Sequence, residues 1–480
     1  MALSDARTVF VISDLHIGGA YAAENGDDGS VAGRGFRICT RVPVLAEFVR
    51  SLPALAGGPV ELVINGDFVD FLAEDHDGEF VSFISDEALA ESVFLEIVER
   101  DLVLFEALRE LVDAGHRVTI LLGNHDIELA YPRVTAALID VLGGPTESLS
   151  IEPYGQPLRI GDAWIEHGNR FDGFNTITAE QLARLVAGDG GWADLPPGSH
   201  LVATLMNPRK RELPFVDLLK PEQQAAIPVL LALDPTARTE LGRLLLLKWY
   251  ADRRIDARAQ RGGLESMSSF DAGEDETDEP GPEDLIFETL AASLGGQEEA
   301  AEFLALIERD ETEAERGLEP MSWNEALGSV ELLLSSRPRI TALWQALQAL
   351  HRDLSFERST ESDPRYLDAI EAIPDARWVV MGHTHLAKLH EDILPGRTYL
   401  NSGTWADLIP FPEHILQGAK SEGIARLKQF LEDLRAGRTN PERLARWIDF
   451  RPTYVRLEYD GSCVTEAALE EYSLRSSLGT

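Results

Sequence analysis

Short apolar runs in this chain end, one after another, in residues that bind metals, and this order constrains the fold more than any other feature. Each run is rich in Val, Ile, Leu or Trp and predicts a buried strand. The five blocks that follow these runs are Asp14-Leu15-His16, Gly66-Asp67, Gly123-Asn124-His125-Asp126, Glu166-His167-Gly168 and Gly382-His383-Thr384-His385. Polar residues just past strand ends gather at one edge of an α/β sheet, where such sheets place their active sites. The blocks therefore indicate a site in which two metal ions activate water against a phosphate ester.

Length and composition bound the class of protein. The 480 residues suffice for two or three domains, and 44% hydrophobic residues allow a sizeable core. No apolar run reaches the roughly 18 residues of a membrane span. The strand-like run at residues 9–12 leaves no room for a signal peptide, and the two cysteines, Cys39 and Cys463, fit a reducing compartment. We therefore expect a cytoplasmic protein without a membrane span.

The net charge of −39 limits the partners of the chain. Such acidity disfavours non-specific binding to nucleic acid or anionic membrane. It leaves a nucleotide substrate open, because two bound cations would form a strong local positive charge. The alternative interpretation is that the acidity serves solubility or a salty habitat.

The periodicity divides the chain into an α/β part and a helical part. Residues 8–170 alternate strand-like and helix-like stretches, which predicts a largely parallel inner sheet. We expect strands at 9–13, 59–65, 117–122, 377–381, 398–401 and, last in the chain, 453–459. We expect helices at 42–52 and 86–114, and a hairpin formed by 158–160 and 163–166.

From about residue 174 to 365 the apolar spacing is helical and strand-like runs are scarce. Helices are expected at 179–187, 236–253, 283–293, 298–307, 323–336 and 340–352. An acidic stretch at 271–284 is expected to be a solvated loop or a disordered segment. The predicted division is a core in two parts, 1–174 and 366–480, with a mainly helical insertion at 175–365.

The spacing within the blocks favours cation binding. Asp14 and His16 are two residues apart, so in an extended chain their side chains point the same way. His383 and His385 repeat this spacing with two imidazoles, and the Asp67 carboxylate can bridge two cations through its two oxygens. Each pair alone also fits an ordinary turn or a surface pair, and the series gives the pattern its weight.

The block Gly123-Asn124-His125-Asp126 is the most specific one. Asn124 offers a neutral oxygen ligand, and His125 can reach the substrate and donate a proton to its leaving oxygen. Asp126 is expected to orient His125. Asp70, in the block that begins with Gly66-Asp67, could support the metal ligands from behind, and the alternative is a role in starting a helix. The alternative for the whole block is a Gly-Asn turn followed by a helix cap.

The mixed nitrogen and oxygen donors suit two divalent metal ions, with manganese the leading candidate and zinc, iron, nickel or cobalt as alternatives. They do not suit calcium.

Taken in order, the blocks resemble the signature of the calcineurin-like metallophosphoesterase superfamily: D-x-H, G-D, G-N-H-D/E, H and G-H-x-H. The resemblance covers residues 9–170 and 377–405. It implies a two-sheet α/β sandwich flanked by helices, carrying here a large helical insertion. It also implies attack by a hydroxide shared between the two metals. The implied roles are Asp14, His16 and His385 on the first metal, Asn124, His167 and His383 on the second, Asp67 between them, and His125 with Asp126 as the catalytic pair.

Within this superfamily the runs Gly66-Asp67-Phe68-Val69-Asp70 and Gly382 to His385 are similar to the UDP-2,3-diacylglucosamine hydrolases. Those enzymes tend to carry Arg where His125 stands and are much shorter. We therefore expect a small phosphodiester, nucleotide or pyrophosphate-containing substrate. The alternatives are a nuclease, which would need a basic channel, and a non-catalytic scaffold that keeps the fold.

The ends of the predicted insertion lie next to His167 and His383 in the sequence. The insertion could therefore roof the site and select substrates, or it could join copies of the chain into a homo-oligomer. Close to His167, Asn169 or Arg170 could contact a substrate phosphate, and a salt bridge within their loop is the alternative.

Overall fold

A computed structural model of the chain describes residues 5–19, 37–75, 79–173, 175–188, 196–210, 212–221, 225–234, 339–352, 356–437 and 440–473. The helices predicted at 236–253, 283–293, 298–307 and 323–336, and the acidic stretch 271–284, lie outside these residues.

The first sheet has six strands in the order β15-β14-β1-β3-β5-β6. Strands β1, β3, β5 and β6 are parallel, as the alternation of strands and helices predicts, and β14 and β15 complete one edge antiparallel. The strands are β1 (Arg7–Ile12), β3 (Val60–Asn65), β5 (Arg117–Leu121), β6 (Leu149–Glu152), β14 (Thr453–Tyr459) and β15 (Val464–Glu471). The prediction that 453–459 is the last strand is wrong, because β15 follows it after a turn at Asp460.

The second sheet has five strands in the order β11-β12-β10-β8-β7. Its strands are β7 (Leu158–Ile160), β8 (Ala163–Ile165), β10 (Trp378–Met381), β11 (Lys388–Leu394) and β12 (Arg397–Asn401). The predicted hairpin is confirmed, since β7 and β8 pair antiparallel. Strand β10 lies parallel to both β8 and β12, so that their carboxyl ends lie at one edge.

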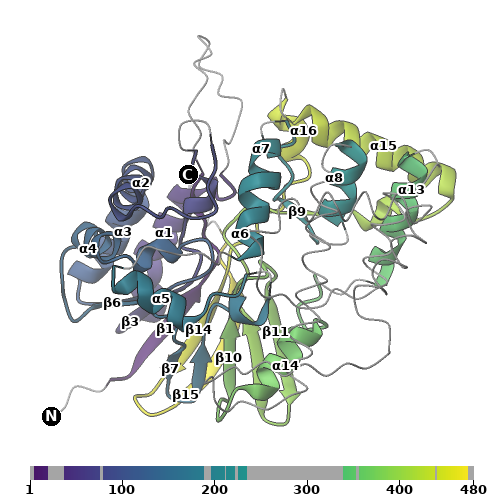
Figure 1. Cartoon of the computed structure of the whole chain (residues 1–480). Helices are drawn as coiled ribbons and strands as arrows, with labels where there is room; N and C mark the ends of the chain where they lie inside the picture. Colours follow the sequence, from purple (N-terminus) through teal and green to yellow (C-terminus); the bar gives the residue numbers. More distant parts are fainter. Residues whose placement is uncertain are drawn as a thin grey trace, which may run out of the picture.

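The two sheets pack face to face, and side-chain alternation explains the layers. On β1, Val9 and Val11 join a buried cluster with β10 and β12, whereas Phe10 and Ile12 face the helices on the other side. On β10, Val380 faces the first sheet and Val379 packs against helix α14 (Pro364–Ala372). The result is the predicted two-sheet α/β sandwich flanked by helices (Figure 1).

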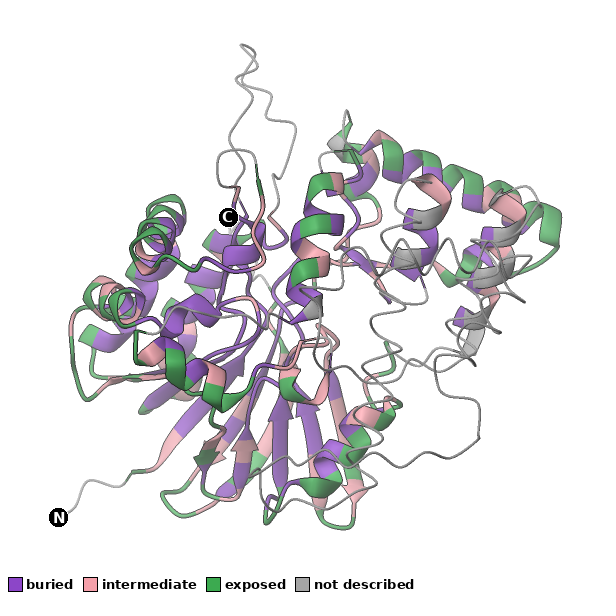
Figure 2. Cartoon of the chain, viewed as in Figure 1, coloured by how far each residue is buried: buried purple, intermediate pink, exposed green. Residues whose placement is uncertain are grey.

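Helices cover the outer face of the first sheet with their apolar sides, while their outer sides are exposed (Figure 2). These helices are α1 (Val42–Ala56), α2 (Glu87–Arg100), α3 (Leu102–Asp113), α4 (Pro132–Val141) and α5 (Ala179–Val186). The single helix predicted at 86–114 is wrong. The backbone of Asp101 leaves the helical range, with φ −115° and ψ 29°, and its buried carboxylate accepts a hydrogen bond from Arg37 at 2.8 Å.

A further helical cluster packs around its own apolar core. It contains α6 (Pro197–Leu201), η4 (Val202–Met206), α7 (Asn207–Lys210), α8 (Ile227–Leu233), α13 (Arg339–Ala346), η6 (Leu347–Arg352), α15 (Lys420–Ala436) and α16 (Pro441–Ala445). Helices α15 and α16 come from beyond residue 365, so this core also draws on the last part of the chain. The predicted division at 174 and 365 stays a prediction. Among the helices of the described residues, none is long and apolar enough to cross a membrane.

Short elements complete the fold near the carboxyl edge of the strands. Strands β2 (Ile17–Gly18) and β4 (Val69–Asp70) pair with each other, and β9 (Leu219–Lys220) pairs with β13 (Ile409–Pro410). Four further short elements are 3₁₀ helices: η1 (Phe71–Ala73), η2 (Ile127–Ala130), η3 (Asn169–Phe171) and η7 (Glu413–Ile415).

Candidate metal centre

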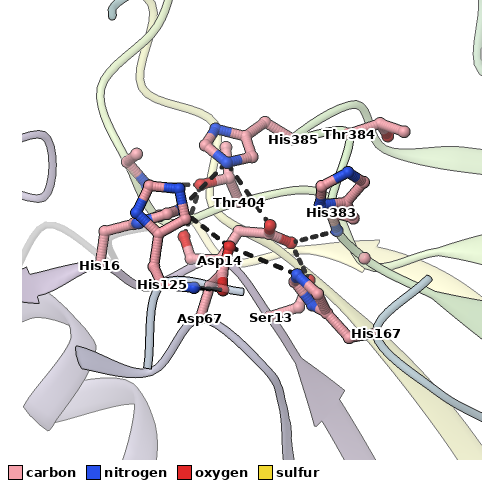
Figure 3. A network of polar contacts seen from close by, with 12 residues as sticks. Ser13, Asp14, His16, Asp67, His125, His167, His383, Thr384, His385 and Thr404 are labelled. Atoms are coloured by element: carbon pink, nitrogen blue, oxygen red, sulfur yellow. Dashed lines mark hydrogen bonds and ion pairs between the residues drawn. The ribbon is translucent and has the colours of Figure 1, made fainter. Parts of the chain in front are cut away.

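All five blocks meet at the carboxyl edge of the strands, between the two sheets (Figure 3). Asp14, Asp67 and Asn124 follow β1, β3 and β5 of the first sheet, while His167 and His383 follow β8 and β10 of the second. The blocks also bond to one another. The backbone amide of Asp14 donates to the carbonyl of Gly66 at 3.2 Å, and that of Gly382 donates to the carbonyl of His167 at 2.9 Å.

One group of ligand atoms comes from Asp14, His16 and His385, which we call the first position. The Nε2 atoms of His16 and His385 are 3.0 Å apart, and the His385 Nε2 is 3.5 Å from Asp14 Oδ1. Burial, followed by the charge of nearby Lys220, lowers the pKa of His385 well below its ordinary value. His385 is therefore neutral, which is the form that binds a metal.

A second group comes from Asp67, His167 and His383, and we call it, together with Asn124, the second position. The Asp67 Oδ2 is 3.3 Å from His167 Nε2 and 3.6 Å from His16 Nε2, so one carboxylate lies between both positions. Burial raises the pKa of Asp67, but His167 and His125 outweigh it and hold the pKa well below its ordinary range. Asp67 is therefore ionised.

The backbone at the centre departs from the extended chain that the sequence spacing assumes. Five of the candidate ligands have left-handed φ angles: Asp14 (53°), His16 (45°), Asp67 (50°), His383 (69°) and His385 (61°). Such angles are uncommon for residues other than glycine, and they cluster at functional sites where the surrounding structure enforces them. The side chains of Asp14 and His16 therefore converge through a strained turn. The predicted extended geometry is wrong, although the predicted convergence is present.

Gly66 and Gly382 are among the glycines that permit the close approach of the blocks. A Cβ on Gly66 would lie 2.5 Å from the ring of His167, and Gly66 also has a φ of 82°. A Cβ on Gly382 would lie 2.5 Å from Ser13 Oγ and 2.7 Å from Asp14 Oδ2. Any larger residue at these places would displace a candidate ligand.

Hydrogen bonds fix the orientation of the candidate ligands. The Nδ1 of His167 lies 2.8 Å from the carbonyl of Asn65, and the Nδ1 of His16 lies 3.2 Å from Asp70 Oδ2. Because both partners only accept hydrogen bonds, each Nδ1 carries a proton and each Nε2 is the ring nitrogen directed at the centre. Burial lowers the pKa of His167, but Asp67 outweighs it and raises the pKa to about 10, so a cation bound at this Nε2 would displace a proton. The Asp14 Oδ2 accepts from Ser13 Oγ and from the backbone amide of His383, which leaves Oδ1 toward the centre.

Asp70, and not Asp126, is the partner of His125. The Nδ1 of His125 lies 3.0 Å from Asp70 Oδ1, so Asp70 holds His16 on one oxygen and His125 on the other. It also caps η1 through the backbone amide of Ala73. Burial lowers the pKa of His125, but Asp70 and Asp67 outweigh it and raise the pKa to about 9. His125 is therefore a protonated imidazole that can donate.

The predicted pairing of Asp126 with His125 is wrong. Both Asp126 oxygens point away from the imidazole and accept from the backbone amides of Phe68 and Gly123, each at 2.7 Å. Burial, helped by the charge of Asp67, raises the pKa of Asp126 to about 7. Asp126 thus ties the strand end after β5 to the strand end after β3.

The loop after β8 contains Arg170, for which the sequence left two roles open, and two further residues that contact the centre. Arg170 pairs with Glu166 at 2.6 Å, which agrees with the salt-bridge alternative. Asp172 lies 3.2 Å from His383, and Asn175 lies 3.4 Å from Asn124. Sequence reasoning missed both contacts, because nothing in a short run after His167 shows that it folds back onto two other blocks.

The residues present fit divalent metal ions. Three buried atoms that face the centre have no hydrogen-bond partner: Asp14 Oδ1, Asn124 Oδ1 and His167 Nε2. Buried polar atoms are normally paired, and these three are the donor atoms that a cation would take. A third group, His16, Asp67 and His125, has equally close ligand atoms, so geometry alone leaves His125 a second role as a ligand.

A sandwich fold with a cluster of His, Asp and Asn at its strand ends provides the donor atoms for a metal centre. A profile of the family described as calcineurin-like phosphoesterase matches residues 7–257, just over half of the chain. The chain belongs to this family and is a phosphoric ester hydrolase. The match includes every block up to His167, and the fold adds His383 and His385. A search of curated proteins gives no match.

Proposed function

We propose that the chain hydrolyses phosphate esters with two divalent metal ions held at the two positions defined above. Asp14, His16 and His385 would hold the first ion, and Asn124, His167 and His383 the second, with Asp67 shared by both. The orphaned buried atoms and the carboxylate between the two groups support this assignment. When bound, the ions supply Lewis-acid activation of water and neutralise charge on the phosphoryl oxygens.

His125 is the residue of the centre placed to meet the substrate. Its side chain is 17% exposed, against 1% for both His16 and His167, 9% for His383 and 11% for His385. Its Nδ1 is engaged by Asp70, so its Nε2–H remains for the substrate. We infer that His125 donates a proton to the leaving oxygen as the bond from that oxygen to phosphorus breaks.

The substrate class follows from this proton donor. A leaving alkoxide is strongly basic and gains most from protonation, so His125 favours an ester with an alcohol leaving group, such as a phosphodiester or a nucleotide. A pyrophosphate-containing small molecule stays a candidate substrate, although its phosphate leaving group needs this proton less. The net charge of −39 disfavours a polyanion such as DNA. Manganese remains the leading candidate for the ions, and the cytoplasm remains the predicted compartment, which cell fractionation would test.

Hydrolysis of bis(p-nitrophenyl) phosphate and of p-nitrophenyl phosphate tests the proposal directly. Metal-stripped protein would receive Mn, Zn, Ni or Co, and we expect metal-dependent cleavage with the diester preferred. Preference for the monoester would contradict the proposed preference for a diester. Absence of cleavage with every metal, with two ions bound, would contradict the enzymatic proposal for these substrates.

We also propose that the segment 175–365 selects the substrate. Asn207 of α7 donates a hydrogen bond to the carbonyl of Leu72 at 2.6 Å, which places this segment against η1, directly after Asp70. Replacing residues 235–338 by a short linker should then change the range of substrates more than the turnover of a small activated ester. An unchanged range together with a changed oligomeric state would favour the oligomer alternative.

A further inference from the structure

The loop after η3 reaches the second position through the carboxylate of Asp172. The Oδ2 atom lies 3.2 Å from His383 Nε2, and Oδ1 accepts from Arg365 Nη1 at 3.0 Å. The Asp172 side chain is 16% exposed and that of Arg365 is 22% exposed, so both lie largely out of water. Neither residue belongs to the five sequence blocks.

The chemistry of the contact fixes the tautomer of His383. An ionised carboxylate only accepts hydrogen bonds, so the proton must sit on His383 Nε2. The lone pair is then on Nδ1, the one remaining nitrogen that can bind a cation. Carboxylates that accept from the non-ligating nitrogen of a metal-binding histidine fix the ring and raise its basicity.

The same loop also reaches the other side of the second position. Asn175 donates to Asp172 Oδ2 at 3.0 Å, and its own Oδ1 lies 3.4 Å from the amide nitrogen of Asn124. This contact turns the amide nitrogen of Asn124 toward Asn175 and leaves Asn124 Oδ1 buried without a partner. One loop therefore touches two of the candidate ligands of the second position.

Arg365 fixes this loop from a distant part of the chain. It stands at the start of α14, 193 residues beyond Asp172, and Asp363 holds its guanidinium with a closest approach of 2.6 Å. A planar guanidinium shared between two carboxylates is a geometrically specific contact. The two ends of the predicted insertion, near 172 and 365, are thus joined directly beside His383.

We propose that Asp172, held by Arg365, is a positioning residue that orients His383 for the second metal ion, so that the ends of the predicted insertion control the affinity of this position. The inference rests on the proposed function, because it takes His383 as a ligand. In this proposal the Asp172–Arg365 pair orients His383, whereas the contact between Arg170 and Glu166 in the same loop does not.

Titration of metal-stripped protein with Mn²⁺ by calorimetry, with visible absorption of the Co²⁺ form, tests this proposal. His383→Ala should remove one ion and thereby identify the ion of the second position. In Asp172→Ala, this ion should bind on the order of 10–100-fold more weakly, and the affinity for the other ion should be unchanged. Arg365→Ala should act in the same direction with a smaller effect. Asp172→Asn, which keeps an accepting oxygen, should retain more affinity than Asp172→Ala. Arg170→Ala is the matched control and should bind both ions as the parent does.

Several outcomes would overturn the inference. The pair would be structural only if Asp172→Ala binds both ions with unchanged affinity or loses affinity equally for both. The same conclusion would follow if Arg170→Ala loses as much affinity as Asp172→Ala. If Asp172→Asn loses as much as Asp172→Ala while Arg365→Ala loses nothing, Asp172 is itself a ligand. Should Asp172→Ala not fold by circular dichroism, Arg365→Ala carries the test alone.

The proposed function can fail separately from this inference. A parent protein that binds fewer than two ions contradicts the two-ion centre, and the inference falls with it. A parent that binds two ions, one of which His383→Ala removes, supports the centre whatever the Asp172 variants show.

Discussion

The first and second positions of the centre contain similar side chains but are held by different parts of the chain. At the first position, Ser13 holds Asp14, and Asp70, three residues after Asp67, holds His16. At the second position, the strand end at Asn65 holds His167, whereas His383 and Asn124 depend on Asp172 and Asn175 from a loop. The strand ends thus build the first position, and the second also needs the loop that leads into the predicted insertion.

Because of this difference, the two positions are not equally free to change. Strand ends are fixed by sheet pairing and by two packed layers, so the first position cannot shift without disturbing the core. Loops are more mobile and tolerate insertions, so the second position is the one whose affinity and surroundings can be tuned.

The largest effect is expected at the residue shared by both positions. Asp67→Asn should weaken both ions and lower turnover on the order of 1,000-fold or more, because several kcal/mol of charge stabilisation depend on the ions. Metal content by mass spectrometry and cleavage of bis(p-nitrophenyl) phosphate would measure this. Loss of one ion only, or near-normal turnover, would show that Asp67 is not shared.

His125 is expected to act in the reaction and not in metal binding at either position. His125→Ala should lower turnover by about 10²–10⁴-fold, the usual contribution of a positioned proton donor, with both ions still bound. The loss should be smaller for a diester with a p-nitrophenolate leaving group than for one with an alkyl leaving group, because the phenolate needs less protonation. Loss of an ion in this variant would instead identify His125 as the third ligand of the group formed with His16 and Asp67.

Two glycine substitutions should separate the positions. Gly66→Ala crowds His167 and should weaken the second ion, whereas Gly382→Ala crowds Ser13 and Asp14 and should weaken the first. Crowding of this kind costs about 1–3 kcal/mol, so each affinity should fall on the order of 10–100-fold. Calorimetric titration with Mn²⁺ would measure both. If the two variants weaken the same ion, the assignment of ligands to two positions is wrong.

The smallest effect concerns Glu128, which belongs to neither position. Its carboxyl is buried behind the centre and accepts from the backbone amide of Ile84 at 3.0 Å, and burial raises its pKa from 4.5 to about 8. A raised pKa of an acid favours folding while the group is protonated. Its stabilisation is therefore complete below about pH 4.5 and is lost as pH rises through 8.

The variant Glu128→Gln should not lose this stability as pH rises, because glutamine does not titrate. Between pH 5 and pH 8.5, its free energy of unfolding should improve relative to the parent by on the order of 2 kcal/mol, measured with urea. The exposed Glu110, which pairs with Arg50 at 2.7 Å, provides the control, and Glu110→Gln should show no such gain. Parallel pH profiles for the parent and Glu128→Gln would contradict the raised pKa.

Strand periodicity and strand-end chemistry are local signals, so they predict the strands and the polar residues that follow them. The two-sheet sandwich and the roles of the seven candidate ligands come from the resemblance to the metallophosphoesterase superfamily. The resemblance of the ordered blocks to the family signature predicts that Asp14, His167 and His385 belong to one site, although they lie far apart in the chain. The break at Asp101 could not be predicted, because it depends on a buried contact with Arg37. Strand β15 has apolar residues at 464, 467, 468 and 469, which do not alternate regularly, so the sequence shows no clear period there.

Partners of the candidate ligands are harder to predict than the ligands themselves. Asp126 is adjacent to His125 in sequence, yet the turn after β5 points its carboxylate at backbone amides, and Asp70 takes its place. Asp172 and Arg365 meet only in the folded chain. Such contacts depend on three-dimensional packing and leave no periodic signal in the sequence.

Anomalous X-ray diffraction from crystals grown with Mn²⁺ would show whether two metal ions flank Asp67. We expect two anomalous peaks, one among Asp14, His16 and His385 and one among Asn124, His167 and His383, with Asp67 contacting both. A single peak, or a peak bounded by His16, Asp67 and His125, would contradict this expectation.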